Sequence, residues 1–120
     1  MREPIRDELR LSHILDACDR LLTYFPQDNV PLLDEKSIEF FGVVKNLEII
    51  GEASYKLSKE FVLEHPDTDW RAMISMRHIM VHGYYQVSPR IVKEIMETEI
   101  RRLRQQVLSY LNYIKSQTNP

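Results

Sequence analysis

The sequence is poor in the residues that build metal sites, disulfides and tight turns. Its 120 residues include one cysteine, four histidines and three glycines. A single cysteine cannot form a disulfide within the chain, and no cysteines and histidines have the spacing of a metal site. Cys18 lies on the apolar side of a helical pattern, so we expect a buried, reduced thiol. We expect any active site to work without a metal ion or a cofactor.

Excess charge of one sign and long apolar runs are also missing. A net charge of -2 argues against a protein that binds nucleic acid through broad electrostatic attraction. Any RNA contact would have to be local, and one cluster that could provide it is Arg101, Arg102 and Arg104, although such arginines more often form the solvated face of a helix. There is no charged-then-apolar leader, and no apolar run could span a bilayer. We expect a soluble, cytoplasmic protein without membrane contact.

Helix formers dominate what is present, and no stretch alternates with the period of a strand. Apolar periodicity and breakers predict helices over residues 5–25, 34–59, 69–82 and 88–115. The expected N-terminal caps are Asp34, then Asp67 or Thr68, then Ser88, with Pro89 at the first helical position. Residues 60–69 form a connection whose apolar residues Phe61, Val62 and Leu63 could plug the core. One all-α domain over residues 1–120, an antiparallel four-helix bundle, is therefore predicted.

The predicted helix over 34–59 has an apolar arc that covers well over half of its circumference. A helix on the outside of a monomeric bundle needs a narrower stripe, so we expect packing on two sides, with a partner subunit of a homodimer on one of them. Gly42 and Gly51 weaken the helix, and close approach of a neighbouring backbone would compensate. Asn46 falls inside the arc. Its amide either bonds within the bundle or points toward the residues described next.

The stretch M-R-H-I-M-V-H-G-Y-Y, residues 76–85, ends a helix at Gly83 and carries Arg77, His82 and Tyr84. Arginine binds phosphate through a fixed fork of donors, and histidine can exchange a proton near neutral pH. Together they suit phosphodiester chemistry, although a surface arginine and a core histidine could be neighbours by chance. Five residues place Arg77 and His82 about 140° apart on an ideal helix. They converge only if the last turn distorts, if the arginine reaches around, or if a second subunit supplies one of them.

Three segments in this order resemble the HepT family, which belongs to the HEPN class of small helical domains. They are N-L-E-I-I-G-E-A (46–53), H-P-D-T-D-W-R-A-M (65–73) and the stretch 76–85. The R-x-x-x-x-H-x-Y motif of the family falls on Arg77, His82 and Tyr84. The motif alone is weak, but the three segments at these separations are specific and extend the resemblance over nearly the whole chain.

The resemblance implies a homodimeric four-helix bundle that acts as a toxin-type ribonuclease without a metal. It also implies an antitoxin partner, a minimal nucleotidyltransferase of the MntA kind, which adds AMP units to the motif tyrosine, here Tyr84. One position departs from the family, because His78 stands where asparagine commonly follows the motif arginine. His78 either adds a proton carrier or marks a site whose activity has drifted.

Two classes of function follow. In the first, the protein is an endoribonuclease in which His82 acts as general base or acid while an RNA 2′-hydroxyl attacks the neighbouring phosphate held by Arg77. In the second, it is a non-catalytic module that docks a nucleotidyltransferase, and Arg77 contacts a phosphate or a structural carboxylate. A histidine phosphotransfer bundle is a weaker third interpretation, because it needs an exposed histidine in the middle of a helix.

Overall fold

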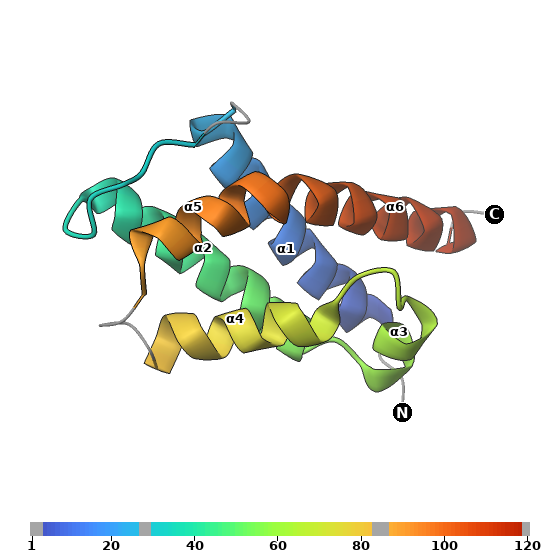
Figure 1. Ribbon diagram of the computed structural model, residues 1–120. Helices are drawn as coiled ribbons and strands as arrows, with labels where there is room; N and C mark the ends of the chain where they lie inside the picture. Colours follow the sequence, from blue (N-terminus) through green and yellow to red (C-terminus); the bar gives the residue numbers. More distant parts are fainter. Residues whose placement is uncertain (1–3, 27–29, 83–86, 119–120) are drawn as a thin grey trace.

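The computed structural model describes residues 4–26, 30–82 and 87–118 of the protein (Figure 1). These residues form helices packed as a bundle, and no strand occurs among them. The helices are α1 (Pro4–Tyr24), α2 (Ile38–Tyr55), α3 (Lys59–Glu64), α4 (Trp70–His82), α5 (Pro89–Thr98) and α6 (Ile100–Thr118). The all-α prediction is confirmed, but the described residues form six helices where the sequence predicted four.

The expected caps are correct at one helix and wrong at two. Ser88 caps α5, its side chain accepts from the N–H of Arg90, and Pro89 opens the helix as predicted. At α2 the cap is Ser37, whose hydroxyl accepts from the N–H of Phe40 at 3.1 Å, and the predicted cap Asp34 closes the preceding turn instead. At α4 the carboxylate of Asp69 accepts from the N–H of Ala72 at 3.0 Å, a bond that neither predicted residue makes.

The two longest predicted helices are each shorter in the structure. The helix predicted over 34–59 ends at Tyr55, and a new helix, α3, starts after Ser58, whose hydroxyl accepts from the N–H of Phe61. The helix predicted over 88–115 is divided at Glu99 into α5 and α6. The hydroxyl of Thr98 donates to the carbonyl of Glu94 at 2.8 Å, and such bonds bend helices.

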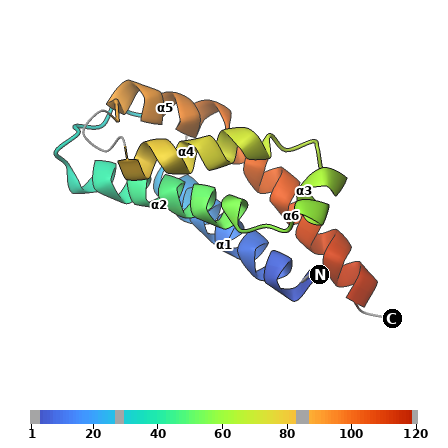
Figure 2. The same ribbon diagram turned by 90° about the horizontal axis from the view of Figure 1, so that it is seen from below.

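Helix α2 occupies the centre of the bundle. It packs against α1 on one side and α4 on the other, and α6 packs on α1 (Figure 2). The core includes side chains with no exposed surface, among them Leu11, Ile14, Leu47, Ile50, Ile100 and Val107. The two-sided packing predicted for α2 is therefore present, but its second neighbour is α4 of the same chain. The partner subunit invoked for that side is not needed to cover it.

Residues outside the central helices complete the core at one end. Phe61 of α3 is buried against Trp70 and Tyr110, so the connection does plug the core as expected, although Leu63 is exposed. Cys18 of α1 is fully buried, as predicted, and this burial together with the neighbouring charge of Asp19 raises the pKa of its thiol to about 12. A neutral, inert thiol follows. In the described part of the chain, no helix has the length and apolar character needed to cross a membrane.

The two glycines of α2 provide a matched test of helix packing. A Cβ on Gly51 would lie 2.7 Å from the backbone Cα of Arg77, whereas a Cβ on Gly42 meets no atom of the described chain within 4 Å. We expect Gly51→Ala to lower the free energy of unfolding by about 1–3 kcal/mol, because α4 must move. We expect Gly42→Ala to raise it by about 0.5–1 kcal/mol, because a helical glycine is removed. Urea denaturation measures both, and equal effects would contradict the close crossing.

Candidate active site

Arg77 lies on α4 at the point where that helix crosses α2. The absence of a side chain at Gly51 lets the two backbones approach, with the backbone of Arg77 directly against Gly51. The close approach expected at Gly51 is therefore confirmed, while the one expected at Gly42 has no counterpart within the described chain. Because its backbone is fixed by helix packing, Arg77 presents its side chain from a defined position beside the next residues of α2.

The guanidinium of Arg77 is held by two residues of α2. Its Nε donates to the carboxylate of Glu52, and its central carbon lies 5.1 Å from the centre of the Tyr55 ring. A guanidinium over an aromatic face is attracted by the ring quadrupole. The side chain of Arg77 is 29% exposed, so part of it still faces solvent. Among the described residues, the terminal nitrogens show no hydrogen-bond partner, and they are the atoms through which arginine binds phosphate.

Glu52 is surrounded by positive charge. The hydrogen bond from Arg77, together with the charges of Arg77 and Lys56, lowers the pKa of its carboxyl below the ordinary value, against an opposing effect of burial. The Nζ of Lys56 lies 3.5 Å from the second carboxylate oxygen. Glu52 is therefore a carboxylate that orients Arg77, and it is unsuited to act as a proton donor near neutral pH.

A groove of about 440 Å³ opens beside this pair, between α1 and α2. Arg77 forms part of its wall, and positively charged or titratable side chains from both other helices complete much of it: Arg10, His13, Lys45 and Lys56. The acidic residues in the wall, Glu48 and Glu52, are each paired with a cation. The groove is therefore suited to an anionic ligand. No group of His, Cys, Asp and Glu side chains in the described segments could hold a metal ion.

The remaining motif residues are placed only in part. His82 is the last residue of α4, but its side chain lies outside the described residues, as does Tyr84 altogether. The backbone is helical from Arg77 to His82, so no break in α4 brings the two positions onto one face. His78 is exposed on the same helix.

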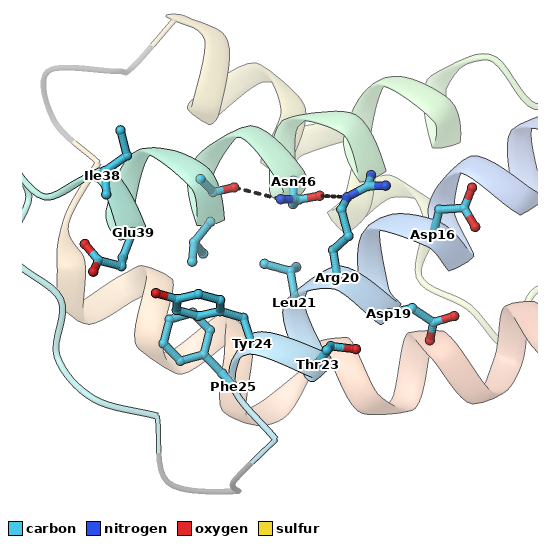
Figure 3. Close-up of a pocket in the computed structure, with 12 residues that line it drawn as sticks. Asp16, Asp19, Arg20, Leu21, Thr23, Tyr24, Phe25, Ile38, Glu39 and Asn46 are labelled. Atoms are coloured by element: carbon cyan, nitrogen blue, oxygen red, sulfur yellow. Dashed lines mark hydrogen bonds between the residues drawn. The ribbon is translucent and has the colours of Figure 1, made fainter.

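Asn46 lies at another groove. Its amide donates to the carbonyl of Gly42 and accepts from Nε of Arg20, each at 2.8 Å (Figure 3). These bonds lie within the bundle, one of the two alternatives left open by the sequence. The groove around it, about 770 Å³, lies between the end of α1 and the start of α2 and is lined by Tyr24, Phe25 and Ile38. Asn46 is not among the residues that line the groove of Arg77.

Sequence reasoning missed Glu52, Tyr55 and Arg10 as neighbours of the site. Glu52 shares a narrow face of α2 with Glu48, Lys45 and Lys56, and spacing along α2 does not say which helix crosses that face. The only available signal was Gly51, a helical glycine directly before Glu52. The sequence singled out another cluster, the three arginines of α6, and each of them contacts a residue of the protein. Arg101 donates to the carbonyl of Pro26. Arg102 pairs with Glu99, and Arg104 pairs with Asp19.

Comparison with known proteins gives a consistent set of similarities. A model of the family described as "Ribonuclease HepT-like" matches residues 14–109. A protein of Caldanaerobacter subterraneus named "Putative RNase" is 34% identical over 101 residues, which are 84% of this chain and 90% of that protein. A "Probable ribonuclease HepT" of Thermococcus cleftensis is 38% identical over 64 residues, covering 53% of this chain and 58% of that protein. No solved structure matches the chain significantly.

The ion pair between Arg77 and Glu52 predicts a pH-dependent contribution to stability. A carboxyl whose pKa is lowered by folding stabilises the protein above its unfolded pKa, near 4.5, and this contribution disappears as the pH falls through the folded value. We expect Glu52→Gln to lower the free energy of unfolding at pH 7 by at most about 1 kcal/mol, because both side chains are partly exposed.

The difference from the wild type should vanish as the pH falls below 4.5 and through the lowered pKa of Glu52. Denaturation curves at pH 7, 5 and 3 measure it. Glu48→Gln is the control, because its partner Lys45 is 67% exposed and holds it more weakly. A difference for Glu52→Gln that persists at pH 3 would contradict the assigned charge interaction.

Proposed function

The chain belongs to the ribonuclease HepT-like family, and from this premise we propose that it is a metal-independent endoribonuclease that serves as the toxin of a toxin–antitoxin pair. The observation that carries the proposal is the state of Arg77. Its guanidinium is held by Glu52 through Nε, and Arg77 forms part of the wall of a groove rich in basic side chains. An arginine held in this way is preorganised for a phosphate.

In the proposed reaction Arg77 binds the scissile phosphate and His82 transfers protons. His82 takes the proton from the RNA 2′-hydroxyl as that oxygen attacks phosphorus. A new bond forms between the 2′-oxygen and phosphorus, and the bond from phosphorus to the 5′-oxygen breaks. The protonated His82 then gives its proton to the leaving 5′-oxygen, and the products are a 2′,3′-cyclic phosphate and a 5′-hydroxyl. DNA is not a substrate for this step, because it lacks the attacking hydroxyl.

The protein is proposed to act as a homodimer with a composite site. Arg77 and His82 are five residues apart on a continuous helix, so a second subunit is one route by which they can share a phosphate. Large exposed apolar side chains near the start of α2, Ile38 and Phe41, favour further association. Light scattering tests the dimer. A stable monomer at micromolar concentration would leave a long reach of the arginine as the remaining route.

A second candidate function is supported by the same contact. Because Arg77 pairs with the carboxylate of Glu52, it could serve only to join α4 to α2 in a module that docks a nucleotidyltransferase. His78, at the position where the family commonly has asparagine, is consistent with a site that has lost activity. The two functions differ in one result. The module binds its transferase without ever cleaving RNA.

We expect Arg77→Ala and His82→Ala each to reduce RNA cleavage by at least about 10²-fold, as is typical when a catalytic proton carrier or charge is removed. Cleavage of a labelled RNA in the presence of EDTA measures this. Arg71→Ala is the matched control, because Arg71 is an exposed arginine of the same helix outside the groove. Cleavage that survives either site substitution, or that requires a divalent ion, would contradict the assigned roles.

Tyr84 is proposed as the site at which the antitoxin silences the protein. It lies two residues beyond His82 in the sequence, so an attached AMP group would be close to the catalytic residues. Its phosphate could pair with Arg77 and occupy the position of the RNA phosphate. Incubation with a cognate MntA-like nucleotidyltransferase, ATP and magnesium should add AMP at Tyr84 and abolish cleavage.

Peptide mass spectrometry locates the added mass, and a Tyr84→Phe variant should stay active in the same mixture. The neighbouring Tyr85 offers a control, since Tyr85→Phe should still be modified and silenced. Modification of Tyr85 alone, or full activity after complete modification of Tyr84, would refute the mechanism.

A further inference from the structure

Basic side chains continue beyond Arg77 along the faces of two helices. On α1, Arg6, Arg10 and His13 recur at steps of four and three residues, which places them on one face. On α2, Lys45 and Lys56 lie three turns apart on the face that looks toward them. The chain as a whole has a net charge of -2, so this gathering of cations is a local feature.

Two grooves meet along these faces. The groove of Arg77 is joined by a second one of about 420 Å³, between the start of α1 and the start of α3. Arg10 and Lys56 line both grooves and connect them, and the second groove adds Arg6 and Lys59. The span from Lys45 to Lys56 is eleven residues of helix, or about 16 Å. This length corresponds to about five stacked nucleotides at 3.4 Å each.

Three acidic residues of this surface, Asp7, Glu48 and Glu52, are committed to protein partners, whereas Glu60 at the edge of the second groove is exposed. Both carboxylate oxygens of Asp7 accept hydrogen bonds from Ser58, at 2.8 and 2.7 Å, and its side chain is buried. Glu52 is held by Arg77 and Lys56. In contrast, Nε of Arg10 is buried and has no hydrogen-bond partner among the described residues. A buried donor without a partner costs free energy unless a ligand or water satisfies it.

An aromatic ring lies beside the cations. Tyr55 is 59% exposed, lines the second groove, and stacks with the guanidinium of Arg77. Single-stranded nucleic acids bind proteins through this combination of a positive groove for the phosphates and exposed aromatic rings for the bases. A duplex would hide its bases from the ring, so the arrangement favours a single strand.

We propose that the joined grooves form the binding path for single-stranded RNA, with Arg6, Arg10, Lys56 and Lys59 contacting phosphates on one side of the scissile bond and Tyr55 stacking on a base. This inference rests on the proposed ribonuclease function and extends it to how the substrate is bound. The path does not include the α6 cluster of Arg101, Arg102 and Arg104, which therefore serves as the comparison surface in the test.

The test measures binding separately from cleavage. The probe is a fluorescein-labelled six-nucleotide RNA with 2′-O-methyl groups, which cannot be cleaved by 2′-hydroxyl attack. Fluorescence anisotropy gives its dissociation constant at several salt concentrations for the full-length protein. The variant Arg6→Ala/Lys59→Ala removes two exposed cations of the path, and Arg101→Ala/Arg102→Ala removes two exposed cations of α6. Both double variants change the net charge by the same amount.

We expect the path variant to bind more weakly and the slope of its plot of log affinity against log salt to flatten by about 0.7 for each phosphate that the protein no longer neutralises. The α6 variant should bind as the wild type does. Tyr55→Ala should weaken binding by about tenfold, within the range for one stacked base, and Tyr55→Phe should restore it. Circular dichroism and thermal unfolding confirm that the variants are folded.

Three results would overturn the path: no binding of the probe by the wild type, equal affinity in the path variant, or a larger decrease of affinity in the α6 variant. Failure of the ribonuclease function gives a different result. The wild type would then leave a cleavable RNA intact, while the probe would still bind with the expected differences between the variants. Cleavage by the wild type with unchanged binding by the path variant would refute the path alone.

Discussion

The crossing of α2 and α4 at Gly51 is the contact on which the rest of the site depends. A side chain at this position would meet the backbone of Arg77, so the two helices can approach only because glycine occupies it. The approach then places Glu52 and Tyr55, one and four residues further along α2, beside the guanidinium. The same contact therefore packs the two helices together and orients the proposed catalytic arginine.

This arrangement gives Arg77 two roles that compete for one group. Pairing with Glu52 keeps the guanidinium in place, at the cost of offsetting part of its positive charge. Arg10 and Lys56 line the same groove and add positive charge around this pair, as the proposed binding of a phosphate requires. A protein of net negative charge can thus present a local anion-binding surface, and net charge alone would not reveal it.

The breadth of the apolar arc on α2 illustrates how a correct observation can have two explanations. The arc does require packing on two sides, and the structure supplies the second side from α4 rather than from another subunit. The case for a dimer consequently depends on exposed apolar side chains such as Ile38 and Phe41, and on the angle between Arg77 and His82.

The sequence by itself determined the helical class, the extents of α1 and α4, the Ser88 cap, the burial of Cys18 and the family motif, because periodicity, capping and motif spacing are properties of residues close together in the chain. Only the tertiary structure decided that Glu52 faces Arg77, that Arg10 of α1 lines the same groove, and that α4 covers the second side of α2. The contact between Glu52 and Arg77 joins residues 25 positions apart, and the others likewise join different helices. They depend on how helices cross, and local spacing cannot specify which faces meet.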